Sequence, residues 1–229
     1  MNFKQVNSNI YTALSIPERA KYDFRAAYYE WLVGTKWFNK ICWNTLPSSY
    51  TEFAGEAILQ KSGRLIDIGC GGLSQTASLY RLTGNNCVLF DRSIGMLKVA
   101  EKRLQDKGKK IPDHIKIIQG DAFDLPFPES CFDILCSFGT LHLFDNKQGF
   151  IERILKVLKP GGHFYFSVMT GNYMNSRVFM NFLRLFGEFG KVCPEKEILS
   201  LFSSDRYRVE SYMKGSVLFI RGKKINFKY

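Results

Sequence analysis

Three aspartates stand at the ends of short apolar runs, which is where an α/β chain presents polar groups to a ligand. Asp67 precedes a glycine-rich turn, Asp91 ends the next apolar run, and Asp121 follows the one after that. Carboxylates in these places can accept hydrogen bonds from an ammonium, from the two hydroxyls of a ribose and from an adenine amino group. The three positions together predict a site for a nucleoside-containing ligand.

The glycine-rich turn after Asp67 favours a close approach of the backbone to that ligand. Gly69 and Gly71 lack a Cβ and readily adopt positive φ. Ser74 is a suitable N-cap residue, so we expect a helix from Ser74 whose free N–H groups point back at the turn. This stretch therefore predicts a strand, a tight turn and a helix, with the ligand crossing the turn.

The same turn is compatible with a nicotinamide dinucleotide. Residues 69–74 nearly fit the pattern G-x-G-x-x-G/A, and Arg92 beside Asp91 could bind a 2′-phosphate. Against this, a carboxylate at Asp67 would repel a pyrophosphate, whereas it suits a ligand that carries an ammonium and a sulfonium. A dinucleotide site also gives no role to the segment around Asp121. The sulfonium ligand is therefore the favoured interpretation.

Five motifs carry a family resemblance, and they occur in the family's order over about residues 50–170. They are Asp67-x-Gly69-x-Gly71, Asp91, Gly120-Asp121-Ala122-x-x-Leu125-Pro126-Phe127, Phe132-Asp133 and Leu158-Lys159-Pro160-Gly161-Gly162. The chain resembles the class I S-adenosylmethionine-dependent methyltransferases, in particular the small-molecule branch that includes the quinone-biosynthesis C-methyltransferases. One position departs from the pattern, because the family has a third alternate glycine where this chain has Leu73.

The resemblance implies a doubly wound, mostly parallel seven-stranded α/β sheet of Rossmann-like type. We expect a single methyltransferase domain over residues 1–229, with a helical lid and acceptor-pocket segment in residues 1–50. Residues 51–170 would form the cofactor-binding core, and residues 171–229 would add helices and the final antiparallel strands. Residues 1–16 carry no strong pattern, and we expect them to be mobile or a conditional lid.

Alternating hydrophobic periodicities predict the individual elements. Strands are expected at 64–68, 86–90, 115–118, 132–138, 163–168, 206–213 and 216–222. Helices are expected at 17–31, 51–61, 74–82, 93–107, 148–158, 176–189 and 195–202. The parallel alternation places the ends of successive strands at one edge of the sheet.

The resemblance also implies which residues bind S-adenosylmethionine. Asp67 would lie toward the amino group, Asp91 would bind the ribose, and Asp121 would hold the adenine amino group. The backbone N–H of Ala122 would meet a ring nitrogen of the adenine. The expected cofactor set is Asp67, Gly69, Cys70, Gly71, Asp91, Arg92, Met96, Asp121, Ala122, Phe123, Ser137 and Phe138. No metal site is expected.

The acceptor side rests on fewer residues. Methyl transfer from a sulfonium mainly requires that two reactants be positioned, so no catalytic triad is needed. His142 follows the fourth predicted strand of the core and could remove a proton from an acceptor, or it could be a hydrogen-bonded structural residue. Residues 137–140 lack the Asn/Asp-Pro-Pro-aromatic tetrapeptide of nucleic-acid amino methyltransferases. We therefore expect a small, aromatic or lipid-like acceptor.

The composition and one motif position suggest two alternative functions, and the composition also suggests a cellular location. The net charge is +11, with basic residues clustered in residues 98–110 and 211–229. Such clusters most often lie on solvated helix and strand faces, but the basic end of the chain would also suit an RNA methyltransferase or contact with an anionic membrane surface. A cofactor-binding regulator without turnover is the other alternative, motivated by Leu73 and by the absence of an obvious base. The six cysteines form no C-x-x-C pair, and the chain shows no secretory signal or long apolar segment. A cytoplasmic location is therefore expected.

Overall fold

The computed structural model describes residues 3–15, 35–106 and 108–226. The helix expected at residues 17–31 lies outside the described residues, so the predicted helical lid is not tested. Among the described residues, no helix has both the length and the apolar character needed to cross a bilayer.

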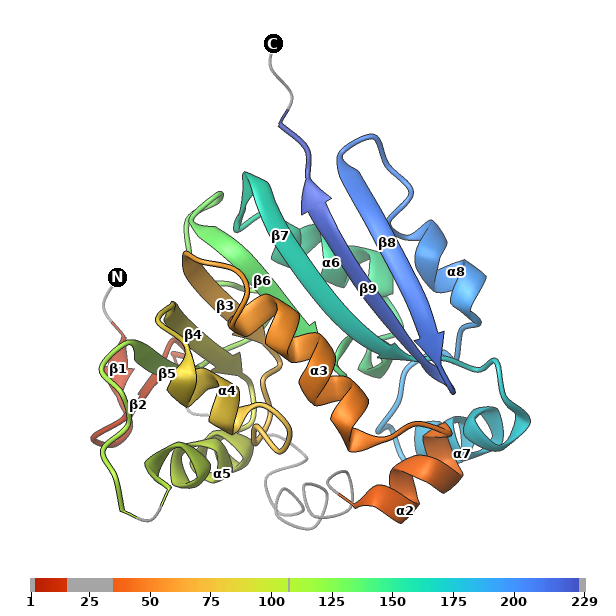
Figure 1. Cartoon of the computed structure of the whole chain (residues 1–229), viewed down its shortest axis with the longest axis horizontal. Coiled ribbons are helices and arrows are strands. Elements are labelled where there is room, and N and C mark those ends of the chain that lie inside the picture. Colours follow the sequence, from red (N-terminus) through yellow and green to blue (C-terminus); the bar gives the residue numbers. More distant parts are fainter. Residues whose placement is uncertain (1–2, 16–34, 107, 227–229) are drawn as a thin grey trace.

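A mixed β-sheet forms the centre of the described residues (Figure 1). Its strands are β1 (Lys4–Gln5), β2 (Ile10–Thr12), β3 (Arg64–Ile68), β4 (Asn86–Asp91), β5 (Ile115–Gln119), β6 (Phe132–Phe138), β7 (Leu158–Met169), β8 (Tyr207–Lys214) and β9 (Val217–Lys224). The spatial order is β1-β2-β5-β4-β3-β6-β7-β9-β8. The strands from β2 to β7 in that order pair in parallel, whereas β9 and β8 continue the sheet in antiparallel fashion.

The predicted number of seven strands is wrong, because the described residues form nine. The strands β3 to β9 correspond to the seven expected, and β1 and β2 extend the sheet beyond β5. Ile10 of β2 lies opposite Ile117 of β5, and Lys4 of β1 lies opposite Thr12. Ile10 is fully buried, which anchors this N-terminal segment. The expectation of a mobile segment in residues 1–16 is therefore wrong for the two strands, whereas the conditional lid stays a prediction.

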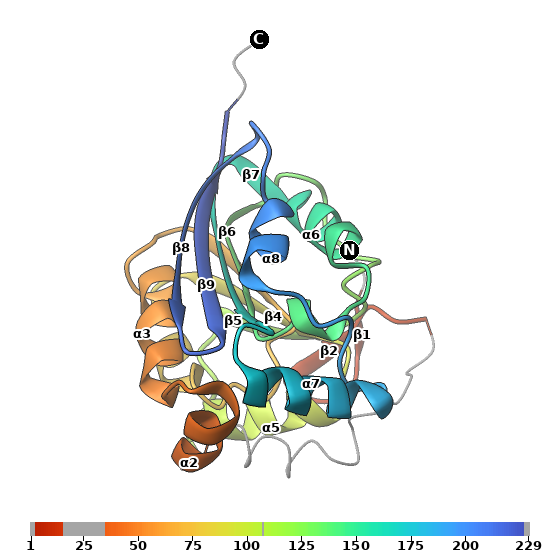
Figure 2. The same cartoon turned by 90° about the vertical axis from the view of Figure 1, so that its right-hand side faces the viewer.

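Helices cover both faces of the sheet (Figures 1 and 2). One face carries α3 (Pro47–Ile58), α4 (Ala77–Leu82) and α5 (Ile94–Gln105), and the other carries α6 (Lys147–Leu155) and α8 (Glu195–Ser200). Beyond the carboxyl ends of the parallel strands lie α2 (Lys36–Phe38), the π-helix η1 (Asn39–Trp43) and α7 (Met174–Leu185), at the bottom of both views. A short 3₁₀ helix, η2 (Leu141–Leu143), follows β6.

The parallel strands are apolar on both faces because each face is covered by helices. In β3, Leu65 belongs to the core beneath α3, and the next residue, Ile66, belongs to the core beneath α6. Both side chains are fully buried. This explains why the strand sequences read as continuous apolar runs and were predictable from sequence.

One strand begins earlier than expected. β7 starts at Leu158, whereas the sequence predicted a helix through Leu158 and a strand from His163. Leu158 pairs with Phe132, and the ladder then shifts register before His163 pairs with Ile134. The glycine- and proline-rich residues between them lie in this irregularity of the ladder, where missing hydrogen bonds are tolerated.

The docking of the N-terminal strands can be tested by shortening a buried side chain. We expect Ile10→Ala to lower the free energy of unfolding by about 2–5 kcal/mol, because it leaves a cavity between β2 and the core. Urea denaturation would measure the change. Val6→Ala is the matched control, since Val6 is 40% exposed, and it should change stability by less than about 0.5 kcal/mol. Equal stability of Ile10→Ala and the wild type would contradict the docking.

Candidate functional site

A cavity of about 530 Å³ opens at the carboxyl edge of the parallel strands. It lies beside β3 and β6, which are neighbours in the sheet. The strand that follows β3 in the chain lies on one side of this pair, and the strand that follows β6 lies on the other side. Such a switch in strand order leaves a crevice where ligands of open α/β sheets bind. The loops after β3, β4, β5 and β6 contribute to its wall, together with the end of β7 and the residues after α7.

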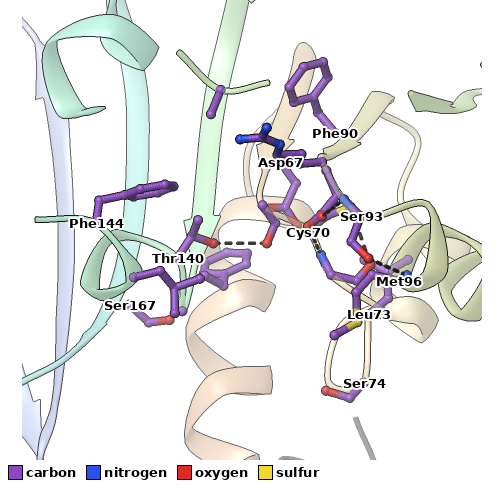
Figure 3. Close-up of a pocket in the computed structure, with 18 of the residues that line it drawn as sticks. Asp67, Cys70, Leu73, Ser74, Phe90, Ser93, Met96, Thr140, Phe144 and Ser167 are labelled. Atoms are coloured by element: carbon purple, nitrogen blue, oxygen red, sulfur yellow. Dashed lines mark hydrogen bonds between the residues drawn. The ribbon is translucent and has the colours of Figure 1, made fainter. Parts of the chain in front are cut away.

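The turn after β3 depends on glycine at its first position. Gly69 has φ of +75°, and its N–H and that of Cys70 donate to the carbonyl of Phe90, at 2.8 and 3.2 Å. A Cβ on Gly69 would collide with the side chain of Thr140. The Thr140 hydroxyl in turn donates to the Gly69 carbonyl at 3.1 Å, as Figure 3 shows. The loops after β3 and β6 are thus packed directly against each other.

Leu73 adopts the conformation that glycine would have at the third alternate position. Its φ is +61°, in the left-handed region, which costs a residue with a Cβ about 1–2 kcal/mol. Its side chain is only 3% exposed, packs into the apolar core and also lines the cavity. Burial of this leucine offsets the backbone strain. The departure from the family pattern at Leu73 therefore leaves the left-handed turn in place.

The helix predicted from Ser74 begins later. The chain continues through a turn after Leu73, and α4 starts at Ala77 with Thr76 as its N-cap. No side-chain hydrogen bond caps this end of the helix. The prediction of Ser74 as the N-cap is wrong because the left-handed residue before it directs the chain into a further turn.

Asp91 joins the loops that follow β3 and β4. Its Oδ2 accepts a hydrogen bond from the N–H of Gly71, and its Oδ1 accepts one from the N–H of Ser93, each at 2.8 Å. Ser93 then caps α5, because its Oγ accepts from the N–H of Met96 at 3.1 Å. The sequence predicted a helix over residues 93–107, and α5 begins directly after Ser93. The Asp91 carboxylate therefore fixes both loops at the cavity wall.

Asp67 is the buried acid of the site. It is 1% exposed, and its Oδ2 accepts from the Tyr80 hydroxyl at 2.8 Å. Its Oδ1 is buried and has no hydrogen-bond partner among the described residues. Burial raises the pKa of Asp67 from 3.8 to about 7, the Tyr80 hydrogen bond opposes this, and the charge of Asp91 adds to it. Asp67 thus presents an unsatisfied acceptor at a cavity that it lines.

The loop after β5 carries a charged pair and an aromatic ring. Oδ2 of Asp121 lies 3.3 Å from Nη1 of Arg92, and its Oδ1 accepts from the N–H of Phe123 at 2.8 Å. The Phe123 ring meets the edge of Phe144 at a centroid distance of 5.2 Å. Arg92, expected to flank an adenine, is therefore engaged with the acid expected to bind the adenine amino group.

The opposite side of the cavity is apolar. Figure 3 shows Phe144 and Ser167 on the side away from Leu73 and Ser74. Ser167 on β7 is buried, and its Oγ has no partner among the described residues. The apolar side chains of this half are Phe138, Leu143, Phe144, Met169 and Phe189.

His142 lies behind this apolar wall rather than on it. The ring is 3% exposed and stacks on Phe189 at a centroid distance of 4.7 Å. Its Nδ1 accepts from the N–H of Met169 at 3.4 Å, and its Nε2 has no partner among the described residues. Burial, with a smaller effect of Lys147, lowers the pKa of His142 to about 3. An imidazole that is this weakly basic and lies behind the cavity wall gives no support to the predicted role of His142 as a base. That role stays a prediction.

Most of the predicted cofactor residues meet at the cavity. Its wall contains Asp67, Gly69, Cys70, Gly71, Asp91, Arg92, Met96, Asp121, Ala122, Phe123 and Phe138. Ser137 of β6 is fully buried and does not belong to the wall, so its predicted place at the cofactor is not supported. Sequence reasoning missed Phe144, Ser167, Met169 and Phe189. The position of Ser167 and Met169 at the end of β7 could have indicated them, whereas Phe144 and Phe189 lie in segments without a motif.

Comparison with known proteins agrees with this architecture. Residues 66–166 match the family model described as a methyltransferase domain. A curated relative, the ubiquinone/menaquinone biosynthesis C-methyltransferase UbiE of Stutzerimonas stutzeri, is 37% identical over 101 residues, which are 43% of this chain and 39% of the relative. The match thus spans about two fifths of that relative's length.

Solved structures share the fold at low sequence identity. The [4+2]-cyclase SpnF superposes with a TM-score of 0.69 and 15% identity, over 89% of this chain and 93% of its own. Human N-acetylserotonin methyltransferase, solved in complex with S-adenosylmethionine, gives a TM-score of 0.64 and 17% identity, over 89% of this chain and 57% of its own. Such likeness shows the fold alone.

The buried carboxyl group of Asp67 predicts a pH dependence of stability. The folded pKa of about 7 lies above the ordinary value of 3.8, so the folded chain retains a proton that the unfolded chain releases. The protonated Asp67 therefore contributes stability to the folded chain that is fully present below pH 3.8 and is lost as pH rises through about 7. The loss is on the order of 4 kcal/mol.

Asp67→Asn keeps the Tyr80 hydrogen bond and removes the titration. We expect the variant's free energy of unfolding, relative to that of the wild type, to increase with pH across this range. Urea denaturation at several pH values would measure it. If the free energies of unfolding of the two proteins changed with pH by the same amount, Asp67 would not titrate in this way.

Proposed function

We propose that this chain, a member of the class I S-adenosylmethionine-dependent methyltransferase family through residues 66–166, transfers a methyl group to a small, largely apolar acceptor. One observation carries the proposal. A single cavity has a half lined by Asp67, Asp91 and Asp121 and another half lined by aromatic and aliphatic side chains. The first half suits S-adenosylmethionine and the second suits the acceptor.

The acidic half fits the polar groups of S-adenosylmethionine. The unsatisfied Oδ1 of buried Asp67 suits a cationic ammonium, which would also favour the ionised form of this carboxyl group. Asp91 would bind the ribose from the end of β4, and Asp121 would bind the adenine amino group from the loop after β5. Gly71, which has positive φ and no Cβ, lets the backbone of this turn approach the cofactor closely.

The chain's own contribution to the reaction is positioning and the exclusion of water. When bound, S-adenosylmethionine supplies a methyl group already activated by its sulfonium. Phe138, Leu143 and Phe144 would hold the acceptor beside that methyl group and keep water away. The buried hydroxyl of Ser167 would orient a polar substituent of the acceptor.

The apolar half favours a ring-shaped or lipid-like acceptor. Phe138, Phe144 and Phe189 offer ring faces and edges, which pack well against an aromatic molecule. The curated relative is named as a quinone-biosynthesis C-methyltransferase. We infer a quinone-like acceptor for this chain as well. Neither the matched family nor the relatives support an RNA acceptor or a regulator without turnover.

Calorimetric titration would test the cofactor first. Purified protein would be titrated in parallel with S-adenosylmethionine, S-adenosylhomocysteine and NADPH. We expect the two adenosyl sulfur compounds to bind and the dinucleotide not to bind. Binding of NADPH alone would overturn the proposal. Methyl transfer to quinone-like phenols, followed by mass spectrometry, would then separate a transferase from a protein of this fold with another activity, such as that named for SpnF.

Asp91→Ala should weaken cofactor binding strongly. The change removes the ribose contacts and also the two bonds to Gly71 and Ser93 that fix the loops. We expect a loss of about 2–4 kcal/mol, or roughly 30- to 1,000-fold in Kd. Calorimetry with S-adenosylhomocysteine would measure it. Asp113→Ala is the matched control, because Asp113 is an exposed acid paired with Lys110. Equal affinity of Asp91→Ala and Asp113→Ala would contradict the placement of the cofactor.

A further inference from the structure

Helix α7 has an unusually apolar outer surface. Ser176 and Met180 turn toward the protein and are 1% exposed. The opposite side carries large apolar side chains that are all more than half exposed, spaced at helical intervals so that they form one stripe. They are Met174, Val178, Phe182, Leu185 and Phe186. Leu185 is 83% exposed.

Two more large apolar side chains are exposed on α2 and η1, which lie beside α7. Trp37 is 57% exposed and Ile41 is 60% exposed. Their segment is held against α7, because Phe38 meets Phe179 edge-on at 5.8 Å and the Ser176 hydroxyl donates to the Cys42 carbonyl at 2.6 Å. Figures 1 and 2 both show α2 and α7 at the same end of the molecule. We call the stripe together with Trp37 and Ile41 the outer face.

The outer face is flanked by cations and lacks acids. Residues 35–50 and 171–187 contain no Asp or Glu. Lys36, Lys40 and Arg177 are exposed there. Arg184 adds a further positive charge, although its guanidinium lies 3.7 Å from Asp145. Exposed apolar and aromatic groups bordered by cations would therefore meet a negatively charged, apolar partner favourably.

We propose that the outer face docks on the surface of an anionic lipid bilayer. A helix whose exposed side carries Phe and Leu next to Arg suits the boundary between head groups and acyl chains, where it lies in the plane of the membrane. Trp37 has the amphipathic ring that favours the same boundary. The head groups would attract Lys36, Lys40 and Arg177.

A second copy of the chain is a poorer occupant. In a two-fold dimer the same surface of each subunit forms the contact, so each residue lies near the same surface of the other subunit. Two outer faces brought together would therefore set Lys36, Lys40 and Arg177 against the same cations, and residues 35–50 and 171–187 supply no acid to pair with them. That arrangement opposes association, whereas an anionic membrane supplies the missing charge.

The outer face lies next to the cavity. Gly187, Glu188 and Phe189 follow α7 directly and form part of the cavity wall. Phe189 is also stacked on Trp43 of η1, at a centroid distance of 6.2 Å. Docking through α7 would therefore bring the cavity close to the lipid surface. Membrane binding by this face does not depend on methyl transfer and can be measured without it.

Vesicle co-sedimentation tests the proposal. The probes are vesicles of phosphatidylglycerol mixed with phosphatidylcholine and vesicles of phosphatidylcholine alone. We expect the wild type to sediment with the anionic vesicles and to bind them less at high salt. The double variant Phe182→Ser/Leu185→Ser should lower the partition coefficient about tenfold or more.

The matched control is Leu59→Ser/Leu82→Ser, which removes exposed apolar side chains at the ends of α3 and α4. Leu59 and Leu82 are 47% and 74% exposed, and the control should bind like the wild type. Circular dichroism would confirm that all variants are folded. Failure of the wild type to bind anionic vesicles would overturn the proposal, as would equal binding by the two double variants. Self-association that depends on Phe182 and Leu185, without vesicle binding, would assign the face to a second copy instead.

Discussion

The carboxylate of Asp91 holds together the region on which the candidate site depends. Its two oxygens accept from Gly71 and Ser93, so a single side chain at the end of β4 fixes the loop after β3 and the start of α5. The carbonyl of the preceding residue, Phe90, accepts from Gly69 and Cys70. The bonds from Gly69, Cys70 and Gly71 join the turn after β3 to the end of the neighbouring parallel strand β4. The shape of the cavity wall follows from these bonds.

One half of the cavity is acidic and the other half is apolar, because different strands supply the two halves. The acids come from the ends of β3 and β4 and from the loop after β5, whereas the apolar wall comes from β6, β7 and the segment after α7. The two halves meet between β3 and β6, which is where the strand order switches direction. Thr140 links the two halves through the Gly69 carbonyl.

The core strands and most of the cofactor residues were predictable because the signal is local. Leu65 and Ile66 form part of a continuous apolar run, which marks a strand buried on both faces. The strand at Lys4–Gln5 has no such signal, since two polar residues pair only because β2 is already docked. The burial of His142 was equally hidden. It depends on Phe189, a residue distant in sequence that stacks on the ring.

The two ends of the sheet in the described residues disfavour self-association by strand addition. Long, flat, uncharged strand edges invite pairing with another chain and lead to aggregation. Here one edge is β1, which is only two residues long, and the other is β8, which exposes Arg208, Glu210 and Lys214. Neither edge is a good template for an added strand. At high concentration, self-association of this protein would therefore proceed through its exposed apolar outer face rather than through the edges of its sheet.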